Sequence, residues 1–378
     1  MAPKWSAIRT WAVLVPVAAL AVAATVDGVR HDPGTAPDAV ETREEDGDTS
    51  RGDEALVGPD SPLPGALPGR LVVTTADGCR LRVVDLASIE LGTLGPTTTC
   101  AIWASPAGGR AAVVAAHSLA DPDAGRFALV RLDDPPKVER RLGEIDGEPS
   151  WSPDGARLAW CTPEGETVVL DIADGGEERS AGCRPRFTPG GSVLTTSADR
   201  LNESLLRDGA VELDPLDLLR GFDASSSGDL DLLGYDEASD GLLAVSVLRL
   251  EPQGSRAVLE LWQEGELVAG VDLPRNGSGP HHFGEYLQFS PNGTVLAIGA
   301  APRGSGMTFV DLRLRRPSLD VDHQRAFAWS PDSAWLAVAG QDEIAVYSAN
   351  GSEPVYRLPL RATAVAWVPD GKQGGEGG

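Results

Sequence analysis

Short apolar runs alternate with turn-forming residues over most of this chain, a pattern typical of β-strands joined by tight turns. One phrase returns along it: an aromatic residue, a small polar residue, proline and a turn pair. Six clear copies begin at Trp103, Trp151, Phe187, Phe289, Trp329 and Trp367, and a degenerate seventh copy runs from Tyr235 to Gly241. The shortest step, from Trp151 to Phe187, is 36 residues, and the longest, from Tyr235 to Phe289, is 54. Steps of this length accommodate four short strands better than a helical repeat.

Apolar strands follow each phrase in a fixed order. The first comes directly after the turn, as in Arg157–Trp160 and Val295–Ile298, and the second, as in Thr167–Ile172, often closes with Asp-Leu or Asp-Ile. Asp-Gly forms the tight turn, proline sets the bend before it, and the aromatic residue fills the space between neighbouring units. We therefore predict an all-β fold over residues 69–371: a seven-bladed β-propeller of four-stranded antiparallel blades.

The phrase resembles the repeat of WD-repeat-like, TolB-type β-propellers: aromatic-Ser-Pro-Asp-Gly, then a strand, then a strand that ends in Asp-Leu. The resemblance covers roughly Gly69 to Gly371. It implies a platform that binds other molecules, because blades of this family serve many unrelated partners.

The two ends of the repeat region complement each other. The last copy, Ala362 to Gly371, has no room after it for three further strands, whereas Arg70–Thr75, Arg80–Leu86 and Ile89–Leu94 precede the first copy. We therefore expect the C-terminal strand to complete the N-terminal blade and close the ring. Two points stay open: Asp214–Gly228 has room for one short helix, and a repeat start at Phe222 instead of Tyr235 would change the blade count.

An apolar run near the N-terminus, Trp11–Val26, predicts a membrane segment. Lys4 and Arg9 precede it and Asp27 follows it, which favours an N-terminus (residues 1–10) in the cytoplasm and an exported remainder. The run is short for a full span, and Ala21-Val22-Ala23 suits signal peptidase. We favour a single-pass transmembrane anchor in the cell membrane, with secretion after cleavage as the alternative.

Residues 27–68 and 372–378 differ from the repeats in composition. The first segment combines clustered acids with scattered prolines and predicts a disordered acidic linker, and the second is a flexible glycine-rich tail. The formal net charge of −24 excludes nucleic acid as an expected partner, because phosphate binding requires a cationic surface. Positive charge comes almost entirely from arginine, with only Lys4, Lys137 and Lys372 as lysines, which we take to indicate a bacterial source.

Four cysteines in an exported chain predict two disulfides. The repeat register places Cys79 and Cys161 at the turn between second and third strands, and Cys100 and Cys183 at the start of an innermost strand. These positions meet on one face, so we expect the pairs Cys79–Cys100 and Cys161–Cys183, each joining a blade to the next. Four cysteines allow other pairings.

No catalytic motif accompanies the repeats. The sequence has no Gly-x-Ser-x-Gly elbow, no phosphate-binding Walker loop and no His-Glu-x-x-His. Only His281-His282-Phe283-Gly284-Glu285 gathers possible metal ligands, and a histidine pair of this kind more often belongs to an ordinary polar loop. We assign no catalytic residue, no metal and no cofactor.

The sequence thus predicts an extracytoplasmic, membrane-tethered binding or scaffold module for a protein or cell-envelope ligand. An enzyme whose site is assembled from loops of several blades is the alternative. The Asp-Gly turns are short and uniform, whereas the segments expected on the opposite face are irregular, and function tends to lie on such loops. Those segments are the expected loops His117–Arg126, Glu251–Arg256, Pro274–Glu285 and Pro302–Gly306. The candidate contacts in them are Arg126, Arg256, His281, His282 and Arg303.

Overall fold

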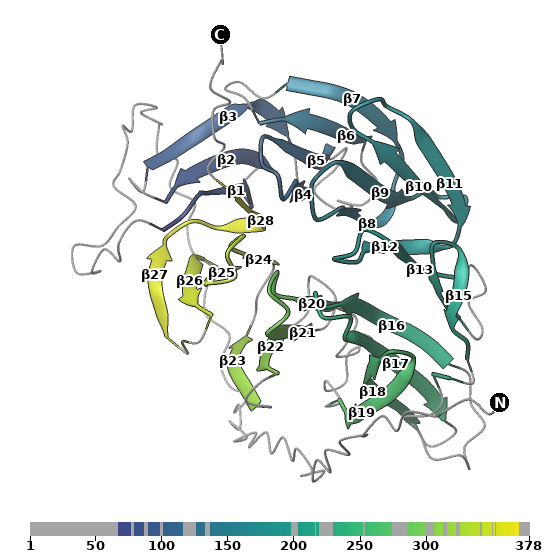
Figure 1. Cartoon of the computed structure of the whole chain (residues 1–378). Coiled ribbons are helices and arrows are strands. Elements are labelled where there is room, and N and C mark those ends of the chain that lie inside the picture. The colour runs from purple at the N-terminus through teal and green to yellow at the C-terminus, as the bar shows by residue number, and fades with distance from the viewer. Residues whose placement is uncertain are drawn as a thin grey trace, which may run out of the picture. The chain divides into compact units, whose positions relative to one another are not determined.

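The computed structural model describes residues 67–76, 79–86, 90–98, 101–115, 126–132, 137–197, 203–215, 217–218, 230–251, 254–273, 286–299, 306–312, 316–322, 326–340, 342–349, 351 and 353–369. All of them belong to one compact unit, Ser50–Gly378. They form seven four-stranded sheets, each antiparallel, whose innermost strands lie around a common centre (Figure 1). The predicted seven-bladed propeller is therefore confirmed.

The blades follow chain order, except that the first one takes its innermost strand from the C-terminus. Blade 1 consists of β28 (Ala362–Val368), β1 (Arg70–Thr75), β2 (Arg80–Asp85) and β3 (Glu90–Thr98). Blade 2 consists of β4 (Ala101–Ala104), β5 (Arg110–Ala115), β6 (Arg126–Arg131) and β7 (Lys137–Gly143). Blade 3 consists of β8 (Asp146–Trp151), β9 (Arg157–Cys161), β10 (Glu166–Asp171) and β11 (Glu177–Ala181).

The other four blades are continuous in sequence. Blade 4 consists of β12 (Cys183–Phe187), β13 (Val193–Thr196), β14 (Leu205–Arg207) and β15 (Ala210–Leu213). Blade 5 consists of β16 (Leu230–Glu237), β17 (Leu243–Glu251), β18 (Gly254–Gln263) and β19 (Glu266–Asp272). Blade 6 consists of β20 (Tyr286–Phe289), β21 (Val295–Gly299), β22 (Gly306–Asp311) and β23 (Arg316–Asp322). Blade 7 consists of β24 (Ala326–Trp329), β25 (Trp335–Ala339), β26 (Ile344–Ser348) and β27 (Pro354–Leu358).

Ring closure occurs where the sequence predicts it. β28 pairs antiparallel with β1, with Val72 opposite Ala366 in the register. The Trp367 indole nitrogen also donates to the backbone oxygen of Pro68 at 2.7 Å. This pairing leaves blade 1 without an unpaired β1 edge, and it makes the first blade depend on the last residues of the fold.

The aromatic residues of the repeat lie between neighbouring blades. Phe309 of blade 6 packs edge-on against Trp329 of blade 7, with ring centroids 5.8 Å apart. Trp151 of blade 3 is buried and donates its indole N–H to the Trp103 backbone oxygen of blade 2 at 2.9 Å. Large rings bury much apolar area, so these contacts contribute a main part of the cohesion between blades.

The Ser-Pro-Asp-Gly turns repeat one hydrogen-bond pattern. In blade 3 the Ser152 hydroxyl donates to the Asp154 carboxylate at 2.6 Å, and that carboxylate accepts from the Ala156 backbone N–H at 3.0 Å. Gly155 has a φ of 68°, and a Cβ built there would lie 2.3 Å from Ser105 Oγ. Glycine is therefore required both for the left-handed backbone and for the approach of blade 2.

The open points about blade 5 are settled in part. Its innermost strand contains Tyr235, so the seventh copy is the predicted one, while Phe222 lies outside the described residues. Glu237, not Tyr235, occupies the place of the repeat aromatic, because Ala238 makes the turn hydrogen bonds that Ser152 makes in blade 3. Within Asp214–Gly228 the described residues contain a turn, in which Leu218 N donates to Asp214 O, and no helix.

The segments predicted at the two termini fall outside the residues that the structure describes. The anchor Trp11–Val26, nearly all of the acidic linker 27–68, and the tail 372–378 lie outside the described residues. No helix within the described ranges has the length and apolar character needed to cross a membrane.

Candidate functional site

The two faces of the ring are defined by the direction of the innermost strands. Each innermost strand begins on one face and ends at the Ser-Pro-Asp-Gly turn on the other; we name these the loop face and the turn face. Second strands run back, so their connections to third strands also lie on the loop face. The candidate contacts were expected there.

The structure describes only part of that candidate set. Arg126 is the first residue of β6, and β6 begins on the loop face. Arg256 lies within β18, opposite Arg249 in the register, so the loop expected over Glu251–Arg256 is wrong: most of it is hairpin. His281, His282 and Arg303 lie outside the described residues.

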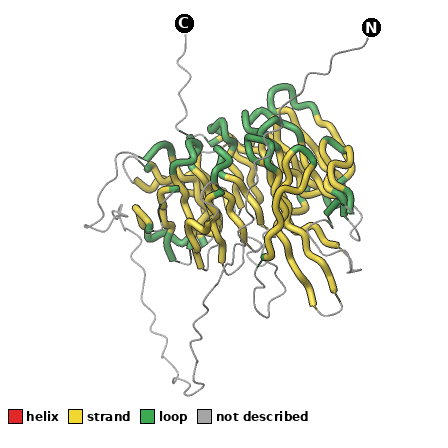
Figure 2. Tube along the Cα trace, turned by 60° about the horizontal axis from the view of Figure 1, so that its bottom comes forward, coloured by secondary structure: helices red, strands yellow, loops and turns green. Residues whose placement is uncertain are grey.

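The error over Arg256 has a clear physical reason. β17 and β18 continue their antiparallel ladder to the pair Glu251 and Gly254, past the last residues of β16 and β19 that pair with them. In Figure 2 a pair of long strands, at the place of β17 and β18 in Figure 1, reaches beyond the other strands. The polar sequence suggested a loop, but a hairpin tip that leaves the core needs no apolar alternation.

The predicted disulfide between blades 3 and 4 is confirmed. Cys161 ends β9, Cys183 begins β12, and the two cysteines are bonded with their Cα atoms 5.1 Å apart. Cys79 is also disulfide-bonded, and Cys100, its expected partner, lies outside the described residues.

Half-buried side chains line the inner side of the innermost strands. In β8, β12, β20 and β24, the residues one and three places before the repeat aromatic are half-buried, whereas the residues between them are buried. Asp236 takes the first of these positions in β16 and is also half-buried. We call the residues of these positions in β8, β12, β16 and β20 the axial polar wall: Glu148, Ser150, Arg184, Arg186, Asp236, Tyr286 and Gln288.

Arg186 links three blades within this wall. Its guanidinium contacts the Glu148 carboxylate of blade 3 at 3.1 Å and lies over the Tyr286 ring of blade 6, 5.8 Å from the centroid. Burial alone would lower the pKa of Arg186, but Glu148, Tyr286 and Asp236 outweigh it and the pKa is raised. Arg186 is therefore a permanent cation.

Asp236 is the least compensated charge of the wall. One carboxylate oxygen accepts from the Phe289 backbone N–H at 2.6 Å, and no described basic side chain forms an ion pair with it. Burial raises the pKa of Asp236 to about 6, although the Phe289 N–H and the charge of Arg186 both lower it. Burial also raises the pKa of the Tyr286 phenol, whose hydroxyl donates to Gln288 Oε1 at 2.9 Å.

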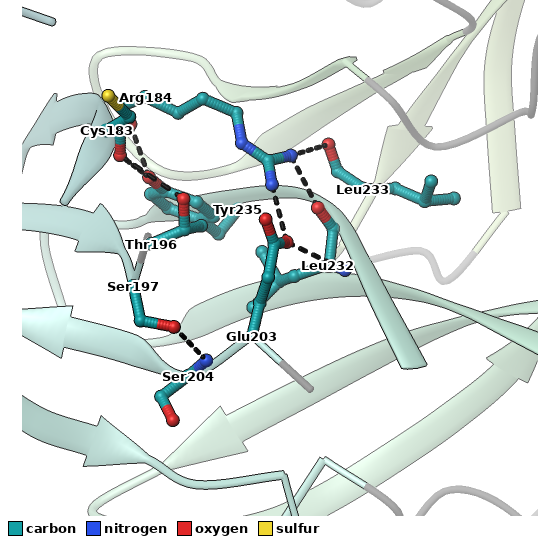
Figure 3. Close-up of polar contacts among 9 residues, drawn as sticks. All are labelled: Cys183, Arg184, Thr196, Ser197, Glu203, Ser204, Leu232, Leu233 and Tyr235. Atoms are coloured by element: carbon teal, nitrogen blue, oxygen red, sulfur yellow. Dashed lines mark hydrogen bonds and ion pairs between the residues drawn. The ribbon is translucent and has the colours of Figure 1, made fainter. Parts of the chain in front are cut away.

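Arg184, the other arginine of β12, joins blade 4 to blade 5 (Figure 3). Its guanidinium donates to the Glu203 carboxylate at 2.6 Å and to the backbone oxygens of Leu232 and Leu233, which the β16 irregularity between Leu232 and Gly234 exposes. Tyr235 donates its hydroxyl back to the Arg184 backbone oxygen. Arg184 has a φ of 55°, a left-handed conformation that these contacts hold in place.

Glu203 is the buried member of this joint. Glu203 is 7% exposed, and its carboxylate also accepts a hydrogen bond from the Leu232 backbone N–H at 3.2 Å. Burial raises the pKa of Glu203, although Arg184 lowers it. The joint is internally compensated, because the Arg184 and Glu203 charges neutralise each other and both bond to the backbone of blade 5. We therefore assign it to structure rather than to ligand binding.

The axial wall has the chemistry of a recognition site. It offers one carboxylate with spare acceptor capacity on β16 of blade 5, and an aromatic ring and an amide on β20 of blade 6, all on rigid strands. No group of three or more His, Cys, Asp or Glu suited to a metal ion occurs among the described residues, and all five histidines lie outside them.

Sequence reasoning missed the axial wall. The available signal was the residue type one and three places before the aromatic. These segments read Glu-Pro-Ser-Trp, Arg-Pro-Arg-Phe and Tyr-Leu-Gln-Phe in blades 3, 4 and 6, against Ala-Phe-Ala-Trp in blade 7. Charge at a position that another blade fills with alanine indicates a role beyond packing.

Comparisons with known proteins add little. No protein-family model matches the chain, and no curated protein matches it. Among solved structures it is similar to the β-propeller domain of Myceliophteria thermophila Cps50 (Swd1), with 13% identity, a TM-score of 0.49, and coverage of 72% of this chain and 90% of that one. It is also similar to a chain in a crystal structure of the mitotic checkpoint complex, with 14% identity, a TM-score of 0.47, and coverage of 91% and 93%. The propeller assignment therefore rests on the strand topology.

Proposed function

We propose that this chain is a non-catalytic binding or scaffold propeller of the TolB type, tethered outside the cytoplasm of a bacterial cell and presenting a ligand surface to a protein or cell-envelope molecule. The supporting observation is the axial polar wall, in which Arg186, Asp236 and Tyr286 come from three different blades. Charged and aromatic groups fixed on separate rigid strands suit recognition.

Two further observations support the exported location. Cys161 and Cys183 form a disulfide between blades, and Cys79 is disulfide-bonded as well. Disulfides persist in oxidising compartments and are rare in the cytosol. The apolar run Trp11–Val26, with Lys4 and Arg9 before it, would export the propeller.

Cell fractionation with protease protection tests the location. We expect the chain in the membrane fraction, with the propeller digested from outside in intact cells and all four thiols unreactive before reduction. Release of a shortened chain into the medium would support signal cleavage instead of anchoring. A full-length cytoplasmic protein with reactive thiols would refute both versions.

Affinity capture tests the binding surface. Membrane extracts are passed over the propeller, and over two variants whose circular dichroism spectra match that of the wild type. The loop-face variant replaces Arg126, Arg256, His281, His282 and Arg303 by alanine, and the turn-face variant replaces Asp154, Asn292 and Asp370. We expect bound proteins to be lost only from the loop-face variant. Loss from the turn-face variant alone would show that the assignment of the face is wrong.

A further inference from the structure

The innermost strands divide into a group with polar side chains toward the ring centre and a group with apolar ones. β8, β12, β16 and β20 supply the axial polar wall, whereas the corresponding half-buried positions in β24 and β28 are Ala326, Ala328 and Ala364. In β4 these positions hold Ala101 and Trp103, because Ser105 makes the turn hydrogen bonds that Ser152 makes in blade 3. β28 lies across the ring from β16 (Figure 1). The polar side chains thus lie opposite an apolar side that consists of alanines and Trp103.

The axial polar wall carries an uncompensated negative charge. Arg184 is paired with Glu203 and is left out of this count. The remaining charged residues of the wall are two carboxylates, Glu148 and Asp236, and one guanidinium, Arg186. Arg186 is engaged with Glu148 at 3.1 Å and with the Tyr286 ring. Tyr286 donates to Gln288, so its hydroxyl is not directed to Asp236.

Asp236 therefore retains the ability to bind a cation. A carboxylate accepts about four hydrogen bonds, and the hydrogen bond at Asp236 comes from the Phe289 backbone N–H at 2.6 Å. The backbone N–H of Glu237 also lowers the pKa of Asp236. Backbone donors stabilise the carboxylate but do not neutralise it.

We propose that Asp236 binds one cationic group, an ammonium or guanidinium carried by the ligand, and that the ligand's aliphatic stem packs on the alanines of the apolar side, Ala326, Ala328 and Ala364. This inference deepens the proposed function, because it names the chemistry of a ligand for the axial wall. Stems of lysine and arginine combine these two properties, an apolar chain and a charged end. An anionic ligand is disfavoured, because Glu148 already occupies the guanidinium of Arg186.

Binding should depend on pH through Asp236. The charged or titratable groups around it are Arg186 on β12, Glu148 on β8, Tyr286 on β20 and Glu237 on β16 itself. Arg186 stays charged and Tyr286 stays neutral near pH 6, because the pKa of each is raised. Protonation of Asp236 below about pH 6 should therefore weaken cation binding, and binding at pH 6 should release protons.

The probe is Nα-acetyl-lysine amide, titrated into the full chain and followed by calorimetry or by NMR shifts. Nα-acetyl-norleucine amide, which has the stem without the charge, is the matched control ligand. We expect the lysine probe to bind and the norleucine probe to bind at least tenfold more weakly, since a charged hydrogen bond at a half-buried site is worth about a factor of ten or more.

Three variants separate this site from a general effect of acidity. Asp236→Asn keeps an acceptor for the Phe289 N–H and should lower affinity about tenfold and remove the pH dependence. Arg186→Met should raise affinity, because it leaves Glu148 unpaired as a second carboxylate. Glu178→Gln, on the fully exposed strand β11, should change nothing.

Equal binding of the two probes, or unchanged lysine binding by Asp236→Asn, would overturn the proposal. Failure of the proposed function looks different. If the lysine probe fails while membrane proteins are still captured through the loop face, the propeller is a binding module without the axial cation site. If the probe binds as expected and neither face captures a partner, the cation site stands and the macromolecular binding role falls.

Discussion

The Asp236 carboxylate accepts a 2.6 Å hydrogen bond from the Phe289 backbone N–H, across the boundary between blades 5 and 6. Ser150 Oγ makes the equivalent bond with Phe187 N between blades 3 and 4, at 3.0 Å. The edge of an innermost strand that faces the ring centre has no neighbouring strand, so its N–H groups need other partners. A side chain one place before the repeat aromatic supplies such a partner to the next blade.

Because Asp236 is half-buried in this arrangement, its ionised form destabilises the folded state. Its pKa is about 6 in the folded chain and about 3.9 in an unfolded one. The folded state then binds more protons between these values, so folding stability falls as pH rises from 4 to 7. As pH rises from 4 to 7, the free energy of unfolding of Asp236→Asn should increase by about 2–3 kcal/mol relative to that of the wild type.

Urea unfolding of both proteins across that pH range measures the difference, because contributions of all other groups cancel. Glu178→Gln on the exposed strand β11 serves as the control and should run parallel to wild type. A constant difference between Asp236→Asn and wild type would show that Asp236 titrates normally.

The features that repeat from blade to blade could be predicted from the sequence. The features that depend on which side chains neighbouring blades bring together could not. Ring closure by Ala362–Val368 and the Cys161–Cys183 bond follow from aligning one repeat with another, and both are confirmed. The axial wall does not follow from alignment, because the ring brings together positions of different blades that no local pattern connects. Arg256 shows the other limit: strand pairing beyond the core satisfies backbone groups without the alternation that marks a strand in sequence.

The disulfide between blades 3 and 4 should contribute to stability by restricting the unfolded chain. Cys161 and Cys183 are 22 residues apart, and a loop of that size corresponds to about 3 kcal/mol. The double variant Cys161→Ala, Cys183→Ala should lose about that much free energy of unfolding, measured by urea without reductant. Wild type and variant should converge in reductant, where the bond is absent from both, and a difference of equal size with and without reductant would assign the loss to packing.

The Arg184–Glu203 pair should be worth more than a surface pair. Arg184→Met leaves the Glu203 carboxylate buried without its cation, a loss of about 2 kcal/mol after allowance for the partial exposure of Arg184. Glu203→Gln should cost less, and the double variant less than the sum of the two. The matched control is Arg179→Met, which breaks the Arg179–Glu166 pair with side chains 55% and 50% exposed and should cost under about 1 kcal/mol. Equal losses at the two sites would contradict a special role for the joint.

Removal of the closing strand should affect the whole ring. A chain that ends at Arg361 lacks β28, and with it the ladder to β1, the buried Trp367 and its bond to Pro68. Burial of single large side chains is worth about 1.5–3 kcal/mol each, so losing this strand approaches the total stability of a domain, about 5–15 kcal/mol. We expect the truncated chain to lose its cooperative urea transition and hydrogen-exchange protection in every blade, including blade 4 across the ring. A chain without residues 372–378 is the control and should unfold like wild type. A synthetic peptide of residues 362–371, added in excess, should restore protection by pairing with β1; protection lost in blade 1 alone, with blade 4 unchanged, would show that the blades hold together without closure.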